Sequence, residues 1–370
     1  MLDRLYVDNY KCLVNFEIRP DDVTLLLGPN GVGKSAVVDV LFALRQLLSG
    51  AAKPSDAVAF PTRTLTRWER RPTQVVEVGA TVGGEPMTYR LELQHEVETR
   101  RVKVALERLT TPDATLFTFE NGEVGLYDDH GRAGARFHAD WNESFLARVV
   151  PGRENRRLTR FLEFIRKIVI CGVYPHGILP ESSTEDAMLA RDGSNFCSWY
   201  RHLAQERLDL VPRYTAALGE VVEGFQALRL EKIGEETRAL AVDFVEGAGR
   251  YALRLDELSD GQRTLLVLYA LLHLTRGQGY TLVLDEPDNY LALGEIQPWL
   301  IELADACGEG IEQAILSSHH PEIIDYLGAD HGLLLQRRAA GPVTIRRASQ
   351  EGLAGSGLRL SEVIARGWEQ

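Results

Sequence analysis

The chain has 370 residues, 45% of them apolar, which is enough to bury a sizeable core in one or two domains. Asp and Glu outnumber Lys and Arg by 53 to 41, so the net charge of −12 argues against a surface built for nonspecific nucleic-acid binding and leaves room only for a local basic patch. No apolar run reaches the length of a membrane span and the four cysteines lack C-x-x-C spacing, which favours a cytoplasmic protein with reduced thiols and no membrane association.

Two strands are predicted at the start of the chain. Residues 2–18 alternate between apolar and polar side chains, with a turn at Asn9-Tyr10-Lys11-Cys12. Taken alone, a lysine in such a turn indicates only a solvated side chain.

A phosphate-binding loop follows the next strand. The apolar run 23–27 leads into Gly28-Pro29-Asn30-Gly31-Val32-Gly33-Lys34-Ser35, a complete G-x-x-x-x-G-K-S motif. Its glycines let backbone N–H groups turn inward around phosphates, and the helix expected over 37–48 points its positive dipole end at them. The motif predicts a nucleotide site in which Lys34 reaches the β and γ phosphates and Ser35 ligates Mg²⁺. The predicted nucleotide contacts are Asn30, Gly31, Gly33, Lys34 and Ser35.

The next part of the chain is predicted to be rich in strands. Four arginines surround Trp68 in the segment 63–71, which suits a nucleic acid, a partner protein or simply a solvated surface. Strands are then expected at 75–82, 87–93, 102–109, 116–120 and 124–127. Helical spacing of apolar residues over 158–165 and the apolar run 168–170 predict a helix followed by a strand.

Residues from about 180 to 250 are predicted to be an insertion into a core formed by 1–179 and 251–370. The insertion has two helical stretches, 195–208 and 212–228, and then strands. It contains no sustained heptad run, so no long coiled coil is expected. The core resumes with Leu258-Ser259-Asp260-Gly261-Gln262 and an apolar helix over 265–272.

Two carboxylates stand at the end of another apolar strand. The run 280–284 ends in Asp285-Glu286-Pro287, and ligands of parallel sheets lie at the carboxyl ends of the strands. Alongside a phosphate-binding loop, Asp285 is expected to hold Mg²⁺ through water, and Glu286 to orient and polarise an attacking water. A further strand ends in Ser317-Ser318-His319, and two more strands are expected at 332–336 and 343–347.

The order of these four segments resembles that of the ATP-binding-cassette (ABC) class of ATPases. The resemblance implies that Ser259, Gly261 and Gln262 belong to the signature motif, which meets the γ-phosphate held by a second subunit. It also implies that His319 is the switch histidine and that Asp288 lies in a loop crossing the dimer interface. The expected fold is an α/β ABC-type P-loop ATPase head with an antiparallel β lobe, a short, mainly helical insertion and no long coiled coil.

Other segments resemble the RecF, SMC and OLD-like branch of that class, and within it compact stand-alone bacterial ATPases. They are the opening Asn9-Tyr10-Lys11 and the segments 191–196 and 285–290. In that branch the residue at the position of Lys11 lies near the nucleotide, which implies a phosphate contact. A glutamine that senses magnesium and water usually follows the strand at 168–170, but Cys171-Gly172-Val173 contains none, so that residue stays unassigned. About fifty residues follow His319, too few for the Toprim nuclease domain of OLD nucleases.

The expected activity is hydrolysis of Mg-ATP by a homodimer that closes on ATP binding, with Lys34, Glu286 and His319 as catalytic residues. The role favoured by the resemblance is a sensor or regulator in defence against phage or foreign DNA, acting with a separate effector such as a nuclease and with DNA as a further candidate partner. A RecF-like repair ATPase is the alternative, which the switch histidine and the net acidity disfavour. A transporter motor is disfavoured by the Asn9-Tyr10-Lys11 opening and the missing glutamine.

Overall fold

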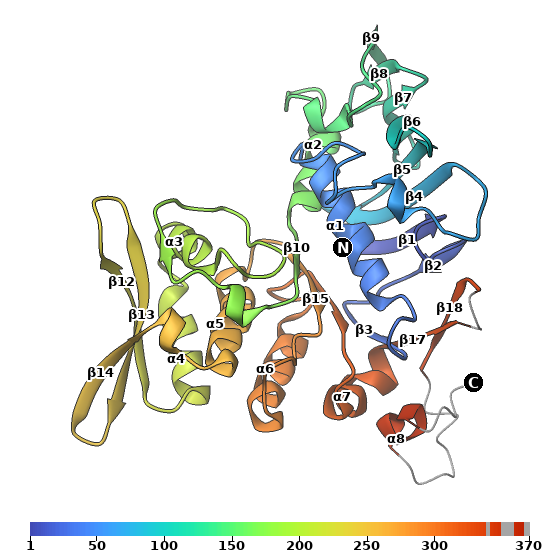
Figure 1. Ribbon diagram of the computed structural model, residues 1–370. Coiled ribbons are helices and arrows are strands. Elements are labelled where there is room, and N and C mark those ends of the chain that lie inside the picture. Colours follow the sequence, from blue (N-terminus) through green and yellow to red (C-terminus); the bar gives the residue numbers. More distant parts are fainter. Residues whose placement is uncertain (338–340, 349–358, 366–370) are drawn as a thin grey trace. The chain divides into compact units, whose positions relative to one another are not determined.

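The computed structural model describes residues 1–337, 341–348 and 359–365, and the chain divides into two compact units (Figure 1). Unit 1 comprises Met1–Ile168 and Gly328–Ala354, and unit 2 comprises Val169–Leu327 and Gly355–Gln370. Each unit therefore joins segments that are far apart in the sequence. The phosphate-binding loop belongs to unit 1, and the segments around Ser259, Asp285 and His319 belong to unit 2.

An eight-stranded antiparallel sheet forms most of unit 1, in the order β2-β1-β4-β5-β6-β7-β8-β9. The strand pair predicted at the start of the chain is present, with Leu5 opposite Ile18. The strands are β1 (Leu2–Asp8), β2 (Phe16–Ile18), β4 (Thr73–Val82), β5 (Glu85–Glu96), β6 (Arg101–Thr110), β7 (Thr115–Glu120), β8 (Glu123–Tyr127) and β9 (Ala133–His138). The predicted strand-rich lobe is therefore confirmed, with β9 as an additional strand.

The sheet is tied to its covering segments by buried polar and aromatic contacts. The ring of Tyr89 on β5 packs against Phe161 of α2 (Arg156–Arg166), with centroids 5.6 Å apart. Glu107 on β6 is fully buried, and its carboxyl group accepts from the Tyr89 hydroxyl at 2.8 Å and from the Ser144 hydroxyl at 2.5 Å. Burial raises the pKa of Glu107, while the hydrogen bonds from its partners oppose that shift. The carboxyl group thereby fastens the loop after β9 to the sheet.

A second group of strands in unit 1 carries the phosphate-binding loop. β3 (Val23–Leu27) pairs in parallel with β17 (Gly332–Arg337), which pairs antiparallel with β18 (Val343–Arg347). All five residues of β3 are buried, as its continuous apolar run predicts. The loop leaves the carboxyl end of β3 and enters α1 (Lys34–Leu48), which starts three residues before the predicted helix.

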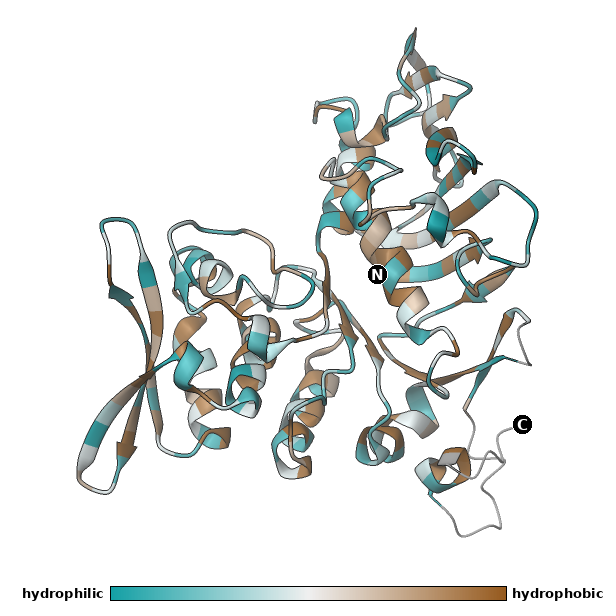
Figure 2. Ribbon diagram, in the orientation of Figure 1, coloured by the Kyte–Doolittle hydropathy of each residue, from teal (hydrophilic) through white to brown (hydrophobic). Residues whose placement is uncertain are grey.

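Unit 2 contains the strands that end in the acidic and histidine segments. β15 (Thr281–Asp285) and β16 (Gln313–Ser317) are parallel, and β10 (Ile168–Cys171) leads into this unit from the end of unit 1. The brown colour of β10 and β15 in Figure 2 reflects their almost continuous apolar residues. The helices of this part are α5 (Asp260–Leu274), α6 (Leu293–Ala306), α7 (Pro321–His331), which extends into unit 1, and α8 (Leu360–Ala365).

Helix α5 is buried from Thr264 onward because neighbouring helices cover it. The indole N–H of Trp299 on α6 donates to the Leu268 carbonyl at 3.0 Å, and the Tyr214 hydroxyl donates to the Leu266 carbonyl at 2.9 Å. Only the first turn of α5 stays accessible, so the N-terminus of this helix is open to solvent.

The predicted insertion lies within unit 2 and contains both the helices and the strands expected there. They are α3 (Phe196–Glu206), α4 (Val211–Val221), β11 (Glu181–Ser182), β12 (Phe225–Lys232), β13 (Arg238–Glu246) and β14 (Gly249–Arg254). The second helix ends at Val221, so its predicted extension to residue 228 is wrong. Gly224 adopts φ +75°, and a Cβ there would lie 2.7 Å from the Val245 carbonyl oxygen, so the chain turns sharply before β12 begins.

Across the described ranges, no helix combines the length and apolarity that crossing a bilayer requires. The cysteines Cys12, Cys171 and Cys197 are buried free thiols, and Cys307 is a half-buried one.

Candidate functional site

The phosphate-binding loop has a shape that only glycines can take at its two ends. Gly28 has φ +134°, and a Cβ there would lie 2.5 Å from the backbone oxygen of Leu335. Gly33 has φ +127°, and its Cβ would lie 2.9 Å from the sulfur of Cys12. At Gly31, by contrast, no atom lies within 4 Å of the added Cβ. The loop is therefore packed against strand β17 and the β1–β2 turn at its ends and open in its middle.

Lys34, the first residue of α1, lies inside this loop. Only 5% of it is exposed, and its ammonium group donates to the Gly28 carbonyl at 2.7 Å and the Pro29 carbonyl at 3.4 Å. Helix α1 has no side-chain N-cap, so its first N–H groups are not satisfied by a capping side chain. Asn30 and Ser35 are exposed on the same loop. A fixed cation, a helix N-terminus and exposed polar groups together suit the binding of a phosphate chain.

Lys11 lies beside the helix that follows this loop. It adopts φ +51°, and its backbone N–H donates to the Thr64 carbonyl at 2.6 Å. Its ammonium group is paired with the carboxylate of Asp39 on α1. In this structure the Lys11 side chain is therefore engaged by α1, and its contact with phosphate stays a prediction.

In unit 2, Ser317 bonds the carboxylate of Asp285 and the backbone N–H of Glu286 at the end of β15. Asp285 and Ser317 are opposite each other in the parallel pair, and the Ser317 hydroxyl donates to Asp285 Oδ1 at 2.5 Å. The backbone N–H of Glu286 points at Ser317 as well, 3.0 Å from its carbonyl oxygen and 3.1 Å from its hydroxyl. Glu286 has φ +51°, a backbone conformation that costs about 1–3 kcal/mol for a residue other than glycine. Ser317 was not among the predicted site residues, although the expected pairing of the two strands could have indicated it.

His319 and Glu286 lie together. Nε2 of His319 is 3.4 Å from Oε1 of Glu286, and the Asn289 amide donates to Oε2 of Glu286 at 3.0 Å. The glutamate side chain is thus held from both sides and still about one-third exposed. A partly exposed carboxylate with a fixed orientation and a neighbouring histidine suits the positioning of a water molecule.

Asp288 points inward rather than outward. Its carboxyl group accepts a hydrogen bond from Ser318, and burial raises its pKa. Its Oδ1 atom is buried, without a hydrogen-bond partner among the described residues.

The predicted signature residues form the beginning of α5. The backbone N–H of Gln262 donates to the Ser259 hydroxyl at 3.2 Å, and the Ser259 N–H donates to Gln262 Oε1 at 3.0 Å. This capping box stabilises the helix start by about 1 kcal/mol. A Cβ at Gly261 would lie 3.1 Å from the backbone oxygen of Tyr290, so the segment after Asp288 packs closely against the first turn. The geometry brings Ser259, Gly261 and Gln262 together at a helix N-terminus.

Three exposed aromatic side chains border this helix start, and the sequence did not single them out. The ring centroids of Tyr174 and His176 are 5.8 Å apart, and those of His176 and Tyr290 are 6.2 Å apart. His176 Nε2 lies 3.3 Å from Oδ2 of Asp260, the first residue of α5. Only the three-dimensional structure brings these residues together.

Gly172 lies in the segment after β10, where the family resemblance leads to the expectation of a glutamine and the sequence has none. A Cβ on this residue would lie 3.2 Å from the Asp285 backbone oxygen. The segment after β10 is instead held by backbone bonds, from Gly172 N–H to the Arg191 carbonyl and from Tyr174 N–H to the Asp192 carbonyl. The close packing leaves little room for a longer side chain at position 172.

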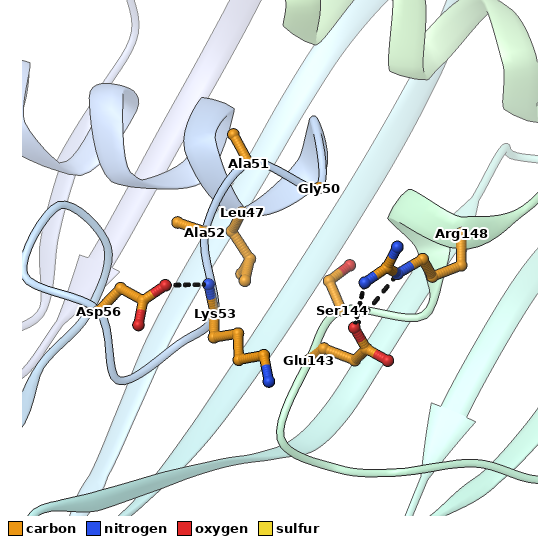
Figure 3. Close-up of a pocket in the computed structure, with 9 residues that line it drawn as sticks. All are labelled: Leu47, Gly50, Ala51, Ala52, Lys53, Asp56, Glu143, Ser144 and Arg148. Atoms are coloured by element: carbon orange, nitrogen blue, oxygen red, sulfur yellow. Dashed lines mark hydrogen bonds and ion pairs between the residues drawn. The ribbon is translucent and has the colours of Figure 1, made fainter.

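A cavity of about 300 Å³ lies at the carboxyl end of α1, away from the phosphate-binding loop (Figure 3). Leu47 forms part of its wall, and Arg148 is paired with Glu143 at 2.6 Å. The Lys53 backbone N–H donates to Asp56 at 2.7 Å, and the Lys53 side chain points into the space between these groups. Cations and carboxylates are balanced there, so the lining does not favour one class of ligand.

Comparison with protein families matches residues 23–325 to the family described as "AAA domain, putative AbiEii toxin, Type IV TA system". The match runs from β3, ahead of the phosphate-binding loop, to a point beyond His319. The chain belongs to this family. As a member of this AAA family it is an ATP hydrolase, and its motifs make it an ABC-type ATPase of the RecF, SMC and OLD-like branch. Among curated proteins, no match to the sequence was found.

The fold of this AAA-family protein is that of SMC heads. An SmcHead bound to the C-winged helix domain of ScpA is 13% identical, with a TM-score of 0.60 and coverage of 95% of this chain and 99% of that chain. An Smc head domain with an extended coiled coil, bound to the C-terminal domain of ScpA derived from Pyrococcus furiosus, is 12% identical. Its TM-score is 0.57, with coverage of 95% of this chain and 97% of that chain. The TM-scores and the coverage establish a shared fold, which confirms the predicted α/β fold of an ATPase head.

Proposed function

We propose that this ATPase binds Mg-ATP, closes head to tail with a second copy of itself and uses the closure to control a separate partner. The observation that carries the proposal is the arrangement at the end of β15, where Ser317 holds Asp285 and Glu286 and His319 lies 3.4 Å from Glu286. Two carboxylates without a function at the end of a strand would not require these features. They are a serine bonded to Asp285 and to the Glu286 backbone, a glutamate with positive φ and a histidine beside it.

The residues present fit Mg-ATP. The loop is closed at Gly28 and Gly33 and open at Gly31, which leaves space for phosphate oxygens against backbone N–H groups. Lys34 would exchange its carbonyl partners for the β and γ phosphates. Mg²⁺ prefers oxygen ligands, and the hydroxyl of Ser35 and the carboxylate of Asp285 would each offer one. The metal would neutralise charge that develops on the phosphates during hydrolysis.

The remaining steps fall to side chains of the chain itself. Glu286, oriented by Asn289 and His319, would hold the attacking water and accept its proton. Ser259 and the first turn of α5 in a second copy would meet the γ-phosphate, because an uncovered helix N-terminus favours an anion. Asp288 and the neighbouring turn would then lie at the interface between the copies. In this arrangement hydrolysis requires both copies.

The biological role we propose is that of an ATP-driven regulator in defence against phage or foreign DNA, working in the cytoplasm with a separate effector. The family description names a toxin of a type IV toxin–antitoxin system, and the similar SMC heads are recorded with a bound ScpA domain. Both fit an ATPase that acts through a partner. DNA contact would fall to Arg67 and Arg70, since Arg63 is bonded to the Ala57 carbonyl and Arg71 is paired with Asp8.

The experiment is to compare wild type with Glu286→Gln by light scattering and ATPase assay. The variant keeps the side-chain shape but removes the base, so it should bind Mg-ATP, accumulate as a dimer and not turn over. Wild type should return to its resting state as ATP is consumed. Hydrolysis by Glu286→Gln at the wild-type rate would show that another group activates the water, and a monomer at saturating ATP would contradict the proposed closure.

A further inference from the structure

We propose that His176 is a positioning residue for closure of the ATP-bound dimer. By pairing with Asp260, the first residue of α5, it engages a carboxylate that would otherwise oppose the phosphate of a nucleotide held by a second copy. The inference rests on the proposed function and adds the residue that makes an acidic helix start compatible with a phosphate. All the residues that carry it belong to unit 2.

The start of α5 carries a negative charge where the proposed function places a phosphate. Asp260 directly follows Ser259, and its side chain is 33% exposed in the first helical turn. A carboxylate there interacts favourably with the positive end of the helix dipole, so it competes with any other anion for that position. It would also repel an approaching γ-phosphate, because like charges a few ångströms apart oppose each other. Closure therefore requires that another group engage this charge.

His176 is the group that engages it. Its Nε2 atom lies 3.3 Å from Oδ2 of Asp260, and no other side chain in the described ranges pairs with this carboxylate. A second carboxylate near the helix start belongs to Glu295, 3.8 Å from the position of an added Cβ at Gly261. Its Oε2 atom accepts from the backbone N–H of Ala292 at 2.7 Å, so it has a partner of its own. Asp260 is thus the carboxylate that His176 balances.

The turn that carries His176 is fastened to the same helix. It is a short 3₁₀ turn, Pro175–Gly177, and the Pro175 carbonyl accepts from the guanidinium group of Arg263 on α5 at 3.2 Å. The Arg263 side chain also donates to the Leu258 carbonyl at 3.0 Å. One arginine therefore binds both the turn and the chain that enters α5, which keeps His176 beside the helix start.

Two tyrosine rings flank the imidazole. The ring centroid of His176 lies 5.8 Å from that of Tyr174 and 6.2 Å from that of Tyr290. Tyr290 is itself packed against α5, since its backbone oxygen would lie 3.1 Å from a Cβ at Gly261. These contacts restrict the imidazole although the His176 side chain is 59% exposed. A restricted side chain loses less conformational entropy when it holds a partner, which suits a positioning role.

The experiment measures the dissociation constant of the ATP-bound dimer by analytical ultracentrifugation in Glu286→Gln protein, which should bind Mg-ATP without hydrolysing it. We expect the addition of His176→Ala to raise this constant by about 10- to 100-fold, because each of the two composite sites loses about three- to tenfold. Asp260→Asn keeps the side-chain shape and removes the charge, so it should dimerise at least as tightly as its parent. In the Asp260→Asn background, His176→Ala should change the constant by less than about twofold.

A salt titration and a control variant separate charge from packing. The loss caused by His176→Ala should shrink as NaCl is raised from about 0.05 to 0.5 M, since salt screens repulsion between accessible charges. His202→Ala is the matched control, because this histidine lies on α3 in the same unit and pairs with no carboxylate in the described part of the chain. It should leave the dissociation constant of the dimer unchanged.

An unchanged dissociation constant in His176→Ala would overturn the inference while leaving the proposed function intact. An equal loss in the Asp260→Asn background, or a loss that salt does not reduce, would also overturn it, because His176 would then only support its turn. Weaker dimerisation of Asp260→Asn alone would contradict the inference without any change at His176. Glu286→Gln protein that stays monomeric at saturating Mg-ATP would refute the proposed closure and this inference with it.

Discussion

Replacing Ser317 with alanine tests whether one hydroxyl group positions the Asp285 carboxylate and the backbone of Glu286. The Ser317 side chain is fully buried, donates to Asp285 at 2.5 Å and accepts from the Glu286 N–H at 3.1 Å. A hydrogen bond to a charged group contributes about 1.5–3 kcal/mol, and the carbonyl of residue 317 would still accept from Glu286. We therefore expect Ser317→Ala to lower kcat by about 10- to 150-fold, with ATP affinity changed by less than about threefold.

The assay is steady-state hydrolysis together with calorimetric titration of ATP. Thr281→Val is the control, since Thr281 lies on β15, the strand that ends in Asp285, and its hydroxyl is buried without a hydrogen-bond partner in the described structure. Its loss should change kcat by less than about twofold. Wild-type kcat in Ser317→Ala would refute the assigned role, and an equal loss in Thr281→Val would attribute the effect to strand packing.

Two other predictions concern binding and stability. Lys34→Ala removes the cation inside the phosphate-binding loop, so calorimetry should detect no ATP binding, and unchanged affinity would contradict the site. His95 is 2% exposed, neither ring nitrogen has a hydrogen-bond partner among described residues, and burial lowers its pKa to about 4 from an ordinary value of 6.5. The folded state therefore binds this proton less readily than the unfolded state, and stability should fall as pH drops from about 6.5 to 4, by up to about 3 kcal/mol from this group. Thermal unfolding of His95→Leu at pH 7, 5 and 4 should show a shallower loss than wild type, and parallel curves would exclude His95 as the cause.

The sequence could predict the elements and the motif positions because each has a local physical signature. The buried run of β3, the alternating strands β4 to β6 and the apolar helix α5 follow from periodicity, and the loop motif requires glycines at fixed places. The apolar pattern predicts that the second helix of the insertion extends to residue 228, but α4 ends at Val221. The turn at Gly224 depends on packing against Val245, which is distant in the sequence.

The sequence could not predict which side chains of different segments contact one another. The Lys11–Asp39 pair, the Ser317 hydrogen bonds and the ring cluster of Tyr174, His176 and Tyr290 all join residues from separate elements. The role of Ser259 as an N-cap was foreseeable, since serine before a helix is common. The proposed contact of Ser259 with the γ-phosphate bound by a second copy depends on an interface between two chains, which a single chain does not contain.

The most direct test of the central claim, that two copies share each ATP site, is ATP hydrolysis by a mixture of Lys34→Ala and Ser259→Arg subunits. Each variant alone should be inactive, since one lacks the phosphate cation and the other presents a bulky cation at the start of α5. Loss of the Ser259 cap costs only about 1 kcal/mol, so the second variant should still fold. In a mixed dimer, the intact loop of one subunit faces the intact signature of the other, and the account predicts that one working site returns. Mixed dimers that form, as shown by differential tagging, but hydrolyse no ATP would contradict it.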